Sequence, residues 1–304
     1  MPTIDLPPWL LSTILAAFGL VLGSFANVLI HRLPQEEPED RNVATKPSHC
    51  PSCKAPIRWY HNVPLLAWLW LRGKCASCGW RIPVRYPLVE LLSGLIFAAS
   101  PWLFPFGTLI WLKGLICGYA LLVLFFTDLT EFILPDALQF PLMALGVLFT
   151  LPQIFWPAHA TRIWISGNQL LSVDTFFNGL QGAPGWHLFG QAVDWKTSLI
   201  GLALGYGGPA LFNQIFKWIR KTDGLGMGDF KMLAWLGAFW GWGPMLGILF
   251  GGAFLGTLVG LPLILLRRAT GKTMLPFGCA LAIVTPPIVF YGPALWVAYL
   301  GLMQ

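Results

Sequence analysis

The sequence has little charge. Of its 304 residues, 11% are charged and 56% are hydrophobic. A soluble domain carries about 25% charged residues, so a single water-soluble core does not fit this composition. A bundle of membrane helices does fit, because each helix satisfies its own backbone hydrogen bonds inside lipid.

Two further absences narrow the possibilities. No basic residue precedes the first apolar run, residues 10–30, and no small-residue cleavage site follows it, so we expect a retained membrane helix rather than a signal peptide. No serine and histidine arrangement suits acyl transfer, because all the histidines fall outside the apolar runs: His31, His49, His61, His159 and His187. The sequence therefore gives no support to a chymotrypsin-like or rhomboid-like mechanism.

Long apolar runs are abundant. A membrane-spanning helix needs roughly 17 to 25 residues, and by that measure we expect about eight spans. They lie near residues 9–30, 88–104, 107–127, 134–156, 197–219, 230–243, 244–266 and 275–303. The expected fold class is an all-α polytopic membrane protein with a small cytoplasmic domain inserted after the first helix.

The net charge of +6 is unevenly distributed. Most Lys and Arg residues fall in three clusters between apolar runs, and such clusters mark the cytoplasmic side of a membrane protein. We therefore expect membrane lipid, and no nucleic acid, as a partner. The expected domains are a first transmembrane helix (1–30), a cytoplasmic domain (31–87) and a transmembrane domain (88–304). The last of these carries a non-cytoplasmic insertion at 157–196.

Two Cys-x-x-Cys pairs occur in the expected cytoplasmic domain, Cys50 with Cys53 and Cys75 with Cys78. Two such pairs can supply the four thiolates of a tetrahedral structural zinc site. Disulfides or a redox couple are the alternative, but disulfides rarely persist in the cytoplasm. We therefore expect zinc. The two remaining cysteines, Cys117 and Cys279, lie in apolar runs and receive no role.

Six acidic residues lie near the ends of expected helices: Glu90, Asp128, Glu131, Asp136, Asp223 and Asp229. Asp128 and Asp229 stand out, because both are expected at the same cytoplasmic depth. Two adjacent carboxylates can share one proton and act as general acid and general base. On depth alone, catalysis stays open against helix capping or an ion pathway.

Five segments, in order, resemble the motifs of the prepilin peptidases, which are GxGD intramembrane aspartyl proteases: Gly23–Val28 with His31–Pro34, Ser48–Cys53, Arg85–Glu90, Thr127–Asp136 and Gly226–Lys231. The resemblance covers nearly the whole chain except 157–196. One departure is Cys279, which follows Leu275-Pro276-Phe277-Gly278 where the resemblance leads us to expect proline.

The resemblance implies a function. The family cleaves the basic leader of type IV prepilins and type II secretion pseudopilins after a glycine, at the cytoplasmic face of the bacterial inner membrane. Members with the four-cysteine domain usually also methylate the new N-terminal amine with S-adenosylmethionine. No glycine-rich turn that would bind this cofactor is found in 31–87. By transfer, the expected site residues are catalytic Asp128 and Asp229, supporting Gly226, Gly228, Lys231, Pro135 and Asp136, and the zinc ligands Cys50, Cys53, Cys75 and Cys78.

Three other functions remain as alternatives. A transporter or channel would use Asp128 and Asp229 along an ion path, but it would need polar residues through the membrane thickness. An assembly scaffold would use zinc and helices without catalysis. A presenilin-like protease has a different first aspartate motif and lacks the cysteine domain.

Overall fold

The computed structural model describes residues 7–37, 39–43, 47–104, 107–151, 162–165, 169–172, 193–221, 224–265 and 276–302. Most of the expected insertion at 157–196 lies outside the described residues, as do Asp223 and the basic cluster at 267–272. The chain forms two compact units, residues 1–127 and 128–304. The expected boundary near residue 87 separates the cytoplasmic domain from the transmembrane domain. It differs from the division at residue 127 and stays a prediction.

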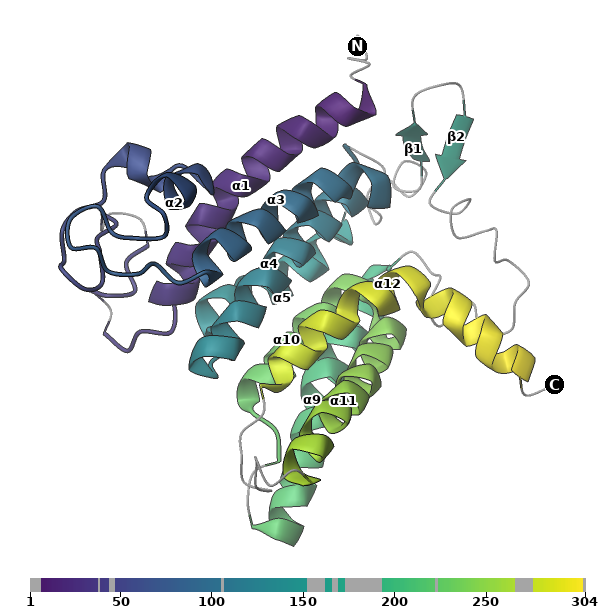
Figure 1. The fold of residues 1–304 in the computed structure, drawn as a ribbon. Helices are drawn as coiled ribbons and strands as arrows, with labels where there is room; N and C mark the ends of the chain where they lie inside the picture. The colour runs from purple at the N-terminus through teal and green to yellow at the C-terminus, as the bar shows by residue number, and fades with distance from the viewer. Residues whose placement is uncertain are drawn as a thin grey trace. The chain divides into compact units, whose positions relative to one another are not determined.

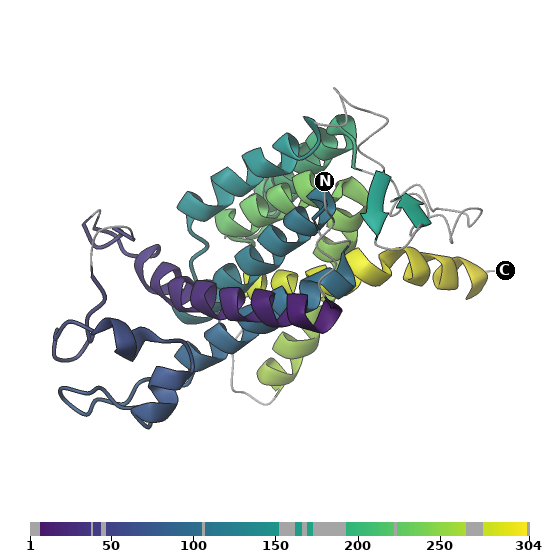
Figure 2. The ribbon, with the colours of Figure 1, turned by 90° about the horizontal axis from the view of Figure 1, so that it is seen from above.

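Two helices, α1 (Pro8–Arg32) and α3 (Arg85–Leu103), lie side by side in the first unit (Figures 1 and 2). The contact is close because α1 presents glycines to α3. A Cβ atom added to Gly23 would lie 2.6 Å from the Cα atom of Glu90. Small residues of this kind let membrane helices approach backbone to backbone.

The chain between α1 and α3 carries little regular structure. It contains one 3-10 turn, η1 (Trp59–Asn62), and one short helix, α2 (Leu66–Trp70). Isolated antiparallel bridges join residue 49 to 56 and residue 74 to 81. Each bridge closes around one Cys-x-x-Cys pair.

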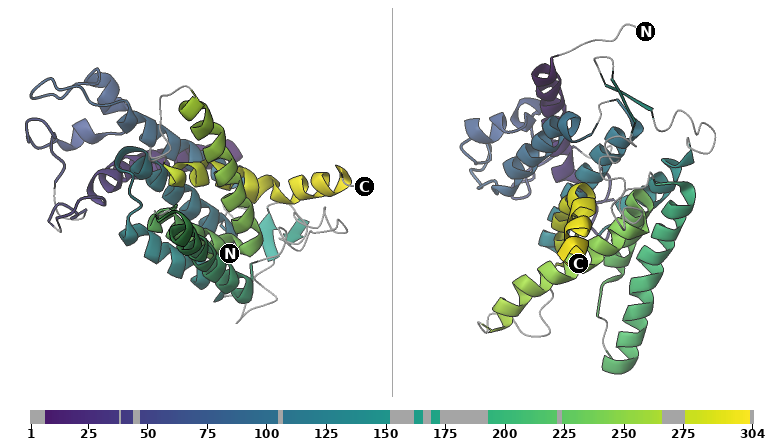
Figure 3. Two further views of the ribbon diagram at one scale, coloured as in Figure 1. Left: turned by 90° about the horizontal axis from the view of Figure 1, so that it is seen from below. Right: turned by 90° about the vertical axis from the view of Figure 1, so that its right-hand side faces the viewer.

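Helix α10 (Met227–Trp240) forms the core of the second unit. It packs against α5 (Asp136–Leu148), α9 (Trp195–Arg220) and α11 (Trp242–Leu265) (Figure 3). Most of its side chains are fully buried, including Trp235. This burial on all sides explains why α10 is apolar around its whole circumference.

The helices confirm the expected all-α class, and one small two-stranded sheet accompanies them. Strands β1 (Arg162–Ile165) and β2 (Gln169–Ser172) pair in antiparallel register. The hairpin falls inside the expected insertion at 157–196. The described residues are otherwise helical or irregular.

Each of the eight expected spans corresponds to a helix, with α4 (Leu109–Glu131) and α12 (Phe277–Leu302) completing the set. Among the residues that the structure describes, five helices are long and apolar enough to cross a membrane: α1, α3, α4, α9 and part of α11. Helices α5 and α10 have 13 and 14 residues. At 1.5 Å per residue they span roughly 20 Å, less than the roughly 30 Å hydrocarbon core. The count of eight spans is therefore not confirmed.

Candidate active site and metal centre

Asp128 lies in the last turn of α4, and its side chain is only 5% exposed. Its Oδ2 atom accepts a hydrogen bond from the backbone amide of Cys279 at 2.9 Å. Cys279 is the third residue of α12, and amides in a first helical turn have no partner inside their own helix. The positive end of the helix dipole also favours a carboxylate there. The start of α12 therefore stabilises the ionised form of Asp128.

Glycine at position 278 makes this contact possible. A Cβ atom there would lie 2.9 Å from Oδ2 of Asp128 and 3.0 Å from Cδ1 of Leu134. A larger residue would push α12 away from the carboxylate. Cys279 was not predicted to have a role, because its contribution comes from the backbone and not from the side chain. The proline expected there has no amide to donate.

Asp229 is the third residue of α10, and its side chain is 9% exposed. Its Oδ2 atom accepts a hydrogen bond from the amide of Gly226 at 3.2 Å, and its own amide donates to the Gly226 carbonyl at 3.1 Å. These reciprocal bonds close the helix start in the manner of a capping box. The carboxylate is thus held at a fixed place by the GxGD segment itself.

The electrostatic environments of Asp229 and Asp128 differ. Asp229 lies outside the five helices of membrane-spanning length. Burial raises the pKa of its carboxyl to about 7, and the nearby charge of Asp128 acts in the same direction. Asp229 therefore keeps its proton up to about neutral pH, and the α12 amide is a contact that favours an ionised Asp128. A carboxyl and a carboxylate that share a site can activate water and protonate a scissile carbonyl oxygen.

The supporting residues connect the two aspartate segments. A Cβ atom on Gly228 would lie 2.9 Å from Cβ of Leu134, so α10 begins in direct contact with the segment after Asp128. Lys231 Nζ lies 2.5 Å from Oδ1 of Asp136, the first residue of α5. Pro135 precedes this helix in an extended conformation. The starts of α5 and α10 are therefore tied together.

The four cysteines of the two pairs form one cluster. The Sγ atoms of Cys50, Cys53, Cys75 and Cys78 all lie within 4.8 Å of one another. The Cys50 and Cys78 sulfurs are 3.9 Å apart, and a tetrahedral zinc site with bonds of about 2.3 Å has sulfurs about 3.8 Å apart. All four thiols are free. The cluster fits a zinc ion.

The two halves of the cluster have the same backbone. The amides of Lys54 and Gly79, each directly after the second cysteine of a pair, donate to the carbonyl of the first cysteine at 2.9 Å. Both residues adopt a left-handed conformation, with φ of 59° and 70°. The same turn at both pairs directs the sulfurs to a common point.

The thiols differ in acidity. Hydrogen bonds from the backbone of Cys78 and Ser77 lower the pKa of Cys75 to about 6. At Cys53 a hydrogen bond with the backbone of Ala55 lowers the pKa, but desolvation and the other three thiols outweigh it and raise the pKa to about 11. A metal binds thiolates and not thiols, so a divalent ion at this cluster would displace the remaining protons and offset the repulsion among the four sulfurs.

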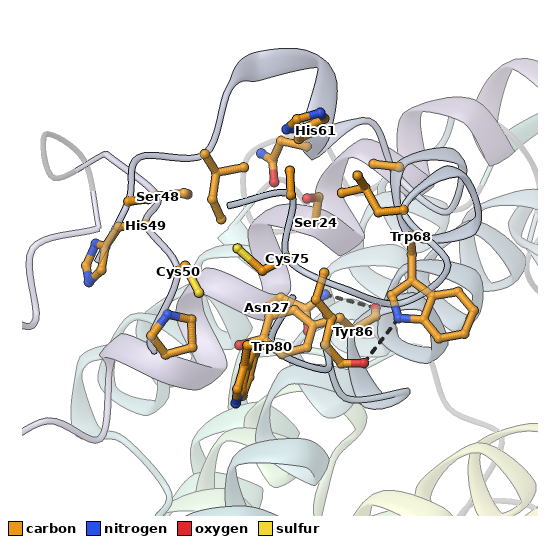
Figure 4. Close-up of a pocket in the computed structure, with 18 of the residues that line it drawn as sticks. Ser24, Asn27, Ser48, His49, Cys50, His61, Trp68, Cys75, Trp80 and Tyr86 are labelled. Atoms are coloured by element: carbon orange, nitrogen blue, oxygen red, sulfur yellow. Dashed lines mark hydrogen bonds between the residues drawn. The ribbon is translucent and has the colours of Figure 1, made fainter. Parts of the chain in front are cut away.

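A cavity of about 260 Å³ lies against the cysteine cluster in the first unit. Figure 4 shows Asn27 of α1 and Tyr86 of α3 on one side, with Cys50 and Cys75 from the connecting chain nearby. Three of the five motif segments contribute to its wall. The cavity could not be predicted from the sequence, because its shape depends on how the irregular chain folds back onto two helices.

Comparisons with known proteins agree with the motif order. A family model described as "Bacterial Peptidase A24 N-terminal domain" matches residues 17–104, and one described as "Type IV leader peptidase family" matches residues 115–261. No solved structure matches the chain.

Curated relatives match nearly end to end. The chain is 35% identical over 315 residues to a prepilin leader peptidase/N-methyltransferase of Aeromonas hydrophila, covering 96% of this chain and 95% of the relative. It is 30% identical over 321 residues to a protein of the same name from Xanthomonas campestris, covering 99% and 98%. A Klebsiella pneumoniae protein of that name is 35% identical over 237 residues, covering 77% and 87%.

Proposed function

This chain belongs to the type IV leader peptidase family, and we propose that it cleaves the leader of type IV prepilins and pseudopilins and then methylates the new N-terminal amine. The observation that carries the peptidase activity is the pair of buried carboxylates in the second unit, Asp128 and Asp229. Transport and scaffold functions are not favoured, because the relatives from Aeromonas hydrophila and Xanthomonas campestris, which match nearly end to end, are named as enzymes.

The two aspartates have different catalytic roles, one as general base and one as general acid. Ionised Asp128, stabilised by the amide of Cys279, accepts a proton from the attacking water. Protonated Asp229, favoured by burial, donates to the carbonyl oxygen of the scissile bond. Peptide hydrolysis then proceeds without a covalent intermediate. Five supporting residues hold the two aspartate segments in place: Gly226, Gly228, Lys231, Pro135 and Asp136.

The protein lies in the bacterial inner membrane, and its catalytic aspartates and zinc domain face the cytoplasm. The concentration of Lys and Arg in residues 31–87 supports this orientation through the positive-inside rule. The domain organisation follows: a first transmembrane helix at 1–30, the zinc domain at 31–87, and a transmembrane protease domain at 88–304 with a non-cytoplasmic insertion at 157–196. The basic leader of the substrate then meets the aspartates where water is available.

Two cofactors belong to this proposal. Cys50, Cys53, Cys75 and Cys78 hold a structural zinc ion, which balances the thiolate charge and locks the connecting chain. S-adenosylmethionine supplies an electrophilic methyl group when bound. The zinc site and the first unit serve methylation, and the aspartates of the second unit serve cleavage.

The test is a reaction with a prepilin-like substrate whose basic leader ends in glycine. Membranes that contain the chain should release the leader. In the presence of S-adenosylmethionine, mass spectrometry should show one added methyl group on the new N-terminus. An intact leader after prolonged incubation would contradict the peptidase, and a cleaved but never methylated product would contradict the second activity.

A further inference from the structure

Three motif segments have no part in the aspartate site. Gly23–Val28, Ser48–Cys53 and Arg85–Glu90 all contribute to the cavity in the first unit (Figure 4). The cavity of about 260 Å³ lies a little below the range of about 300 to 1,000 Å³ typical of small-molecule sites. Its size suits a small molecule and is too small for a peptide helix.

Asn27 points to a ligand. It is 4% exposed, and its Nδ2 atom donates to the Tyr86 carbonyl at 3.0 Å, which fixes the amide. Its Oδ1 atom is buried and has no hydrogen-bond partner. An unpaired buried acceptor costs free energy, of the order of 1 to 3 kcal/mol, unless a donor is supplied. A ligand with an N–H group supplies one.

Glu90 adds a carboxyl group to the same wall. It is 9% exposed, and its Oε2 atom accepts a hydrogen bond from the amide of Leu65 at 2.8 Å. Leu65 has a positive φ of 58°, which is strained for a residue with a bulky side chain. The carboxylate therefore fixes the connecting chain. A cationic group bound in the cavity would stabilise its ionised form.

Aromatic rings complete the lining. Trp68 donates from Nε1 to the Ile82 carbonyl at 3.3 Å, and its ring lies against Gly73, where an added Cβ atom would be 3.0 Å away. Its orientation is thus fixed by contacts on two sides. Trp80 and Tyr86 also line the cavity (Figure 4). Aromatic faces bind both nucleobases and cations.

We propose that this cavity binds the methyl donor, S-adenosylmethionine, with Asn27 and Glu90 as its polar contacts. The donor combines a nucleobase, N–H groups and a sulfonium cation, and the cavity combines aromatic faces, a free acceptor and a carboxylate. The inference rests on the proposed methyltransferase activity and locates its donor site in the cavity of the first unit. In the transfer, the substrate's neutral amine bonds to the methyl carbon, the carbon–sulfur bond breaks with its electron pair left on sulfur, and the methylated nitrogen loses a proton.

The zinc site supports this cavity directly. Cys50 and Cys75 belong both to the cysteine cluster and to the cavity wall. Loss of the metal would release both turns and deform the donor site. Asn27, Glu90 and the two cysteine turns come from three separate parts of the chain. The cavity therefore exists only when the first unit is folded.

The test measures binding independently of activity. Radiolabelled S-adenosylmethionine is cross-linked to the purified full-length chain by ultraviolet light, and the labelled peptides are mapped by mass spectrometry. We expect the label on peptides that line the cavity, from residues 24–32, 48–82 or 86–90. In equilibrium binding, Glu90→Gln should raise the Kd at least about tenfold, because a charged contact is lost while the acceptor for Leu65 is kept.

Glu37→Gln is the matched control, since it removes an exposed carboxylate from the same unit outside the cavity and should leave the Kd unchanged. Label confined to residues 128–304, or an unchanged Kd in Glu90→Gln, would overturn the cavity assignment while leaving methylation itself intact. A wild-type chain that cleaves its substrate but binds no S-adenosylmethionine would overturn the methyltransferase activity as well. Zinc content verifies that each variant is folded.

Discussion

The backbone amide of Cys279 donates a hydrogen bond to Oδ2 of Asp128 at 2.9 Å. These residues are 151 positions apart, and the contact places the first aspartate at the start of α12. The Asp229 carboxyl instead accepts the amide of Gly226, at the start of its own helix. Each aspartate thus has its own backbone donor, and the two differ in the surroundings that set their protonation.

Replacing Cys279 by proline would remove the donor to Asp128. A first helical turn tolerates proline, so α12 should still form. The ionised carboxylate loses a charge-assisted hydrogen bond of about 1.5 to 3 kcal/mol, and the acidic limb of the pH profile of kcat/KM should move up by about one to two pH units. Cys279→Ala keeps the amide and should keep the wild-type profile. Identical pH profiles for the two variants would show that the hydrogen bond from the Cys279 amide to Asp128 does not affect catalysis.

The wild-type enzyme should have a bell-shaped pH profile. In the proposed mechanism, cleavage needs an ionised Asp128 and a protonated Asp229. The pKa of Asp229 is raised to about 7 by burial and by Asp128, so the rate should fall as the pH rises through that value and the proton is lost. At low pH the rate falls again as Asp128 is protonated. Measurement of kcat/KM against pH tests this, and a rate that keeps rising to about pH 9 would contradict a protonated Asp229.

Gly228→Ala should impair cleavage. The new Cβ atom would approach Cβ of Leu134 to 2.9 Å, so α10 must move away from the segment that follows Asp128. A displacement of about 1 Å at a catalytic group can cost about 10²-fold in rate. Gly207→Ala is the control, because no heavy atom lies within 4 Å of its added Cβ atom. Equal kcat values for the two variants would contradict the close-approach argument.

Metal analysis of the purified chain should find one zinc ion per molecule. Cys75→Ser should lose the zinc and, with it, S-adenosylmethionine binding, because Cys75 belongs to both the cluster and the cavity wall. Ser52→Ala changes an exposed residue inside one turn and should retain both. Stoichiometric zinc in Cys75→Ser, or two disulfides in place of zinc in the wild type, would contradict the metal site.

Much of the fold follows from apolar runs, since burial in lipid requires a minimum length of hydrophobic helix. The eight expected segments all contain helices, but α5 and α10 are too short to cross a bilayer. Their apolar character reflects burial against other helices, which a hydropathy pattern does not distinguish from burial in lipid. The hairpin at residues 162–172 gave no periodic signal strong enough to be predicted.

The candidate site was predictable where side-chain identity carries the information. Cysteine spacing predicted the cluster that brings Cys50, Cys53, Cys75 and Cys78 together. The amide of Cys279 and the free Oδ1 atom of Asn27 were not predictable, because one is a backbone group and the other depends on what tertiary contacts leave unpaired. The catalytic roles of the two aspartates stay predictions.

The most direct measurement compares prepilin cleavage by the wild type, Asp128→Asn, Asp229→Asn and the control Glu131→Gln in membranes. Asparagine keeps the shape of the side chain and removes its proton chemistry, while Glu131 is an exposed carboxylate one turn from Asp128. Both aspartate variants should remain folded and lose cleavage by about 10²- to 10⁴-fold or more, and the control should cleave normally. Wild-type cleavage by either aspartate variant would contradict the catalytic pair.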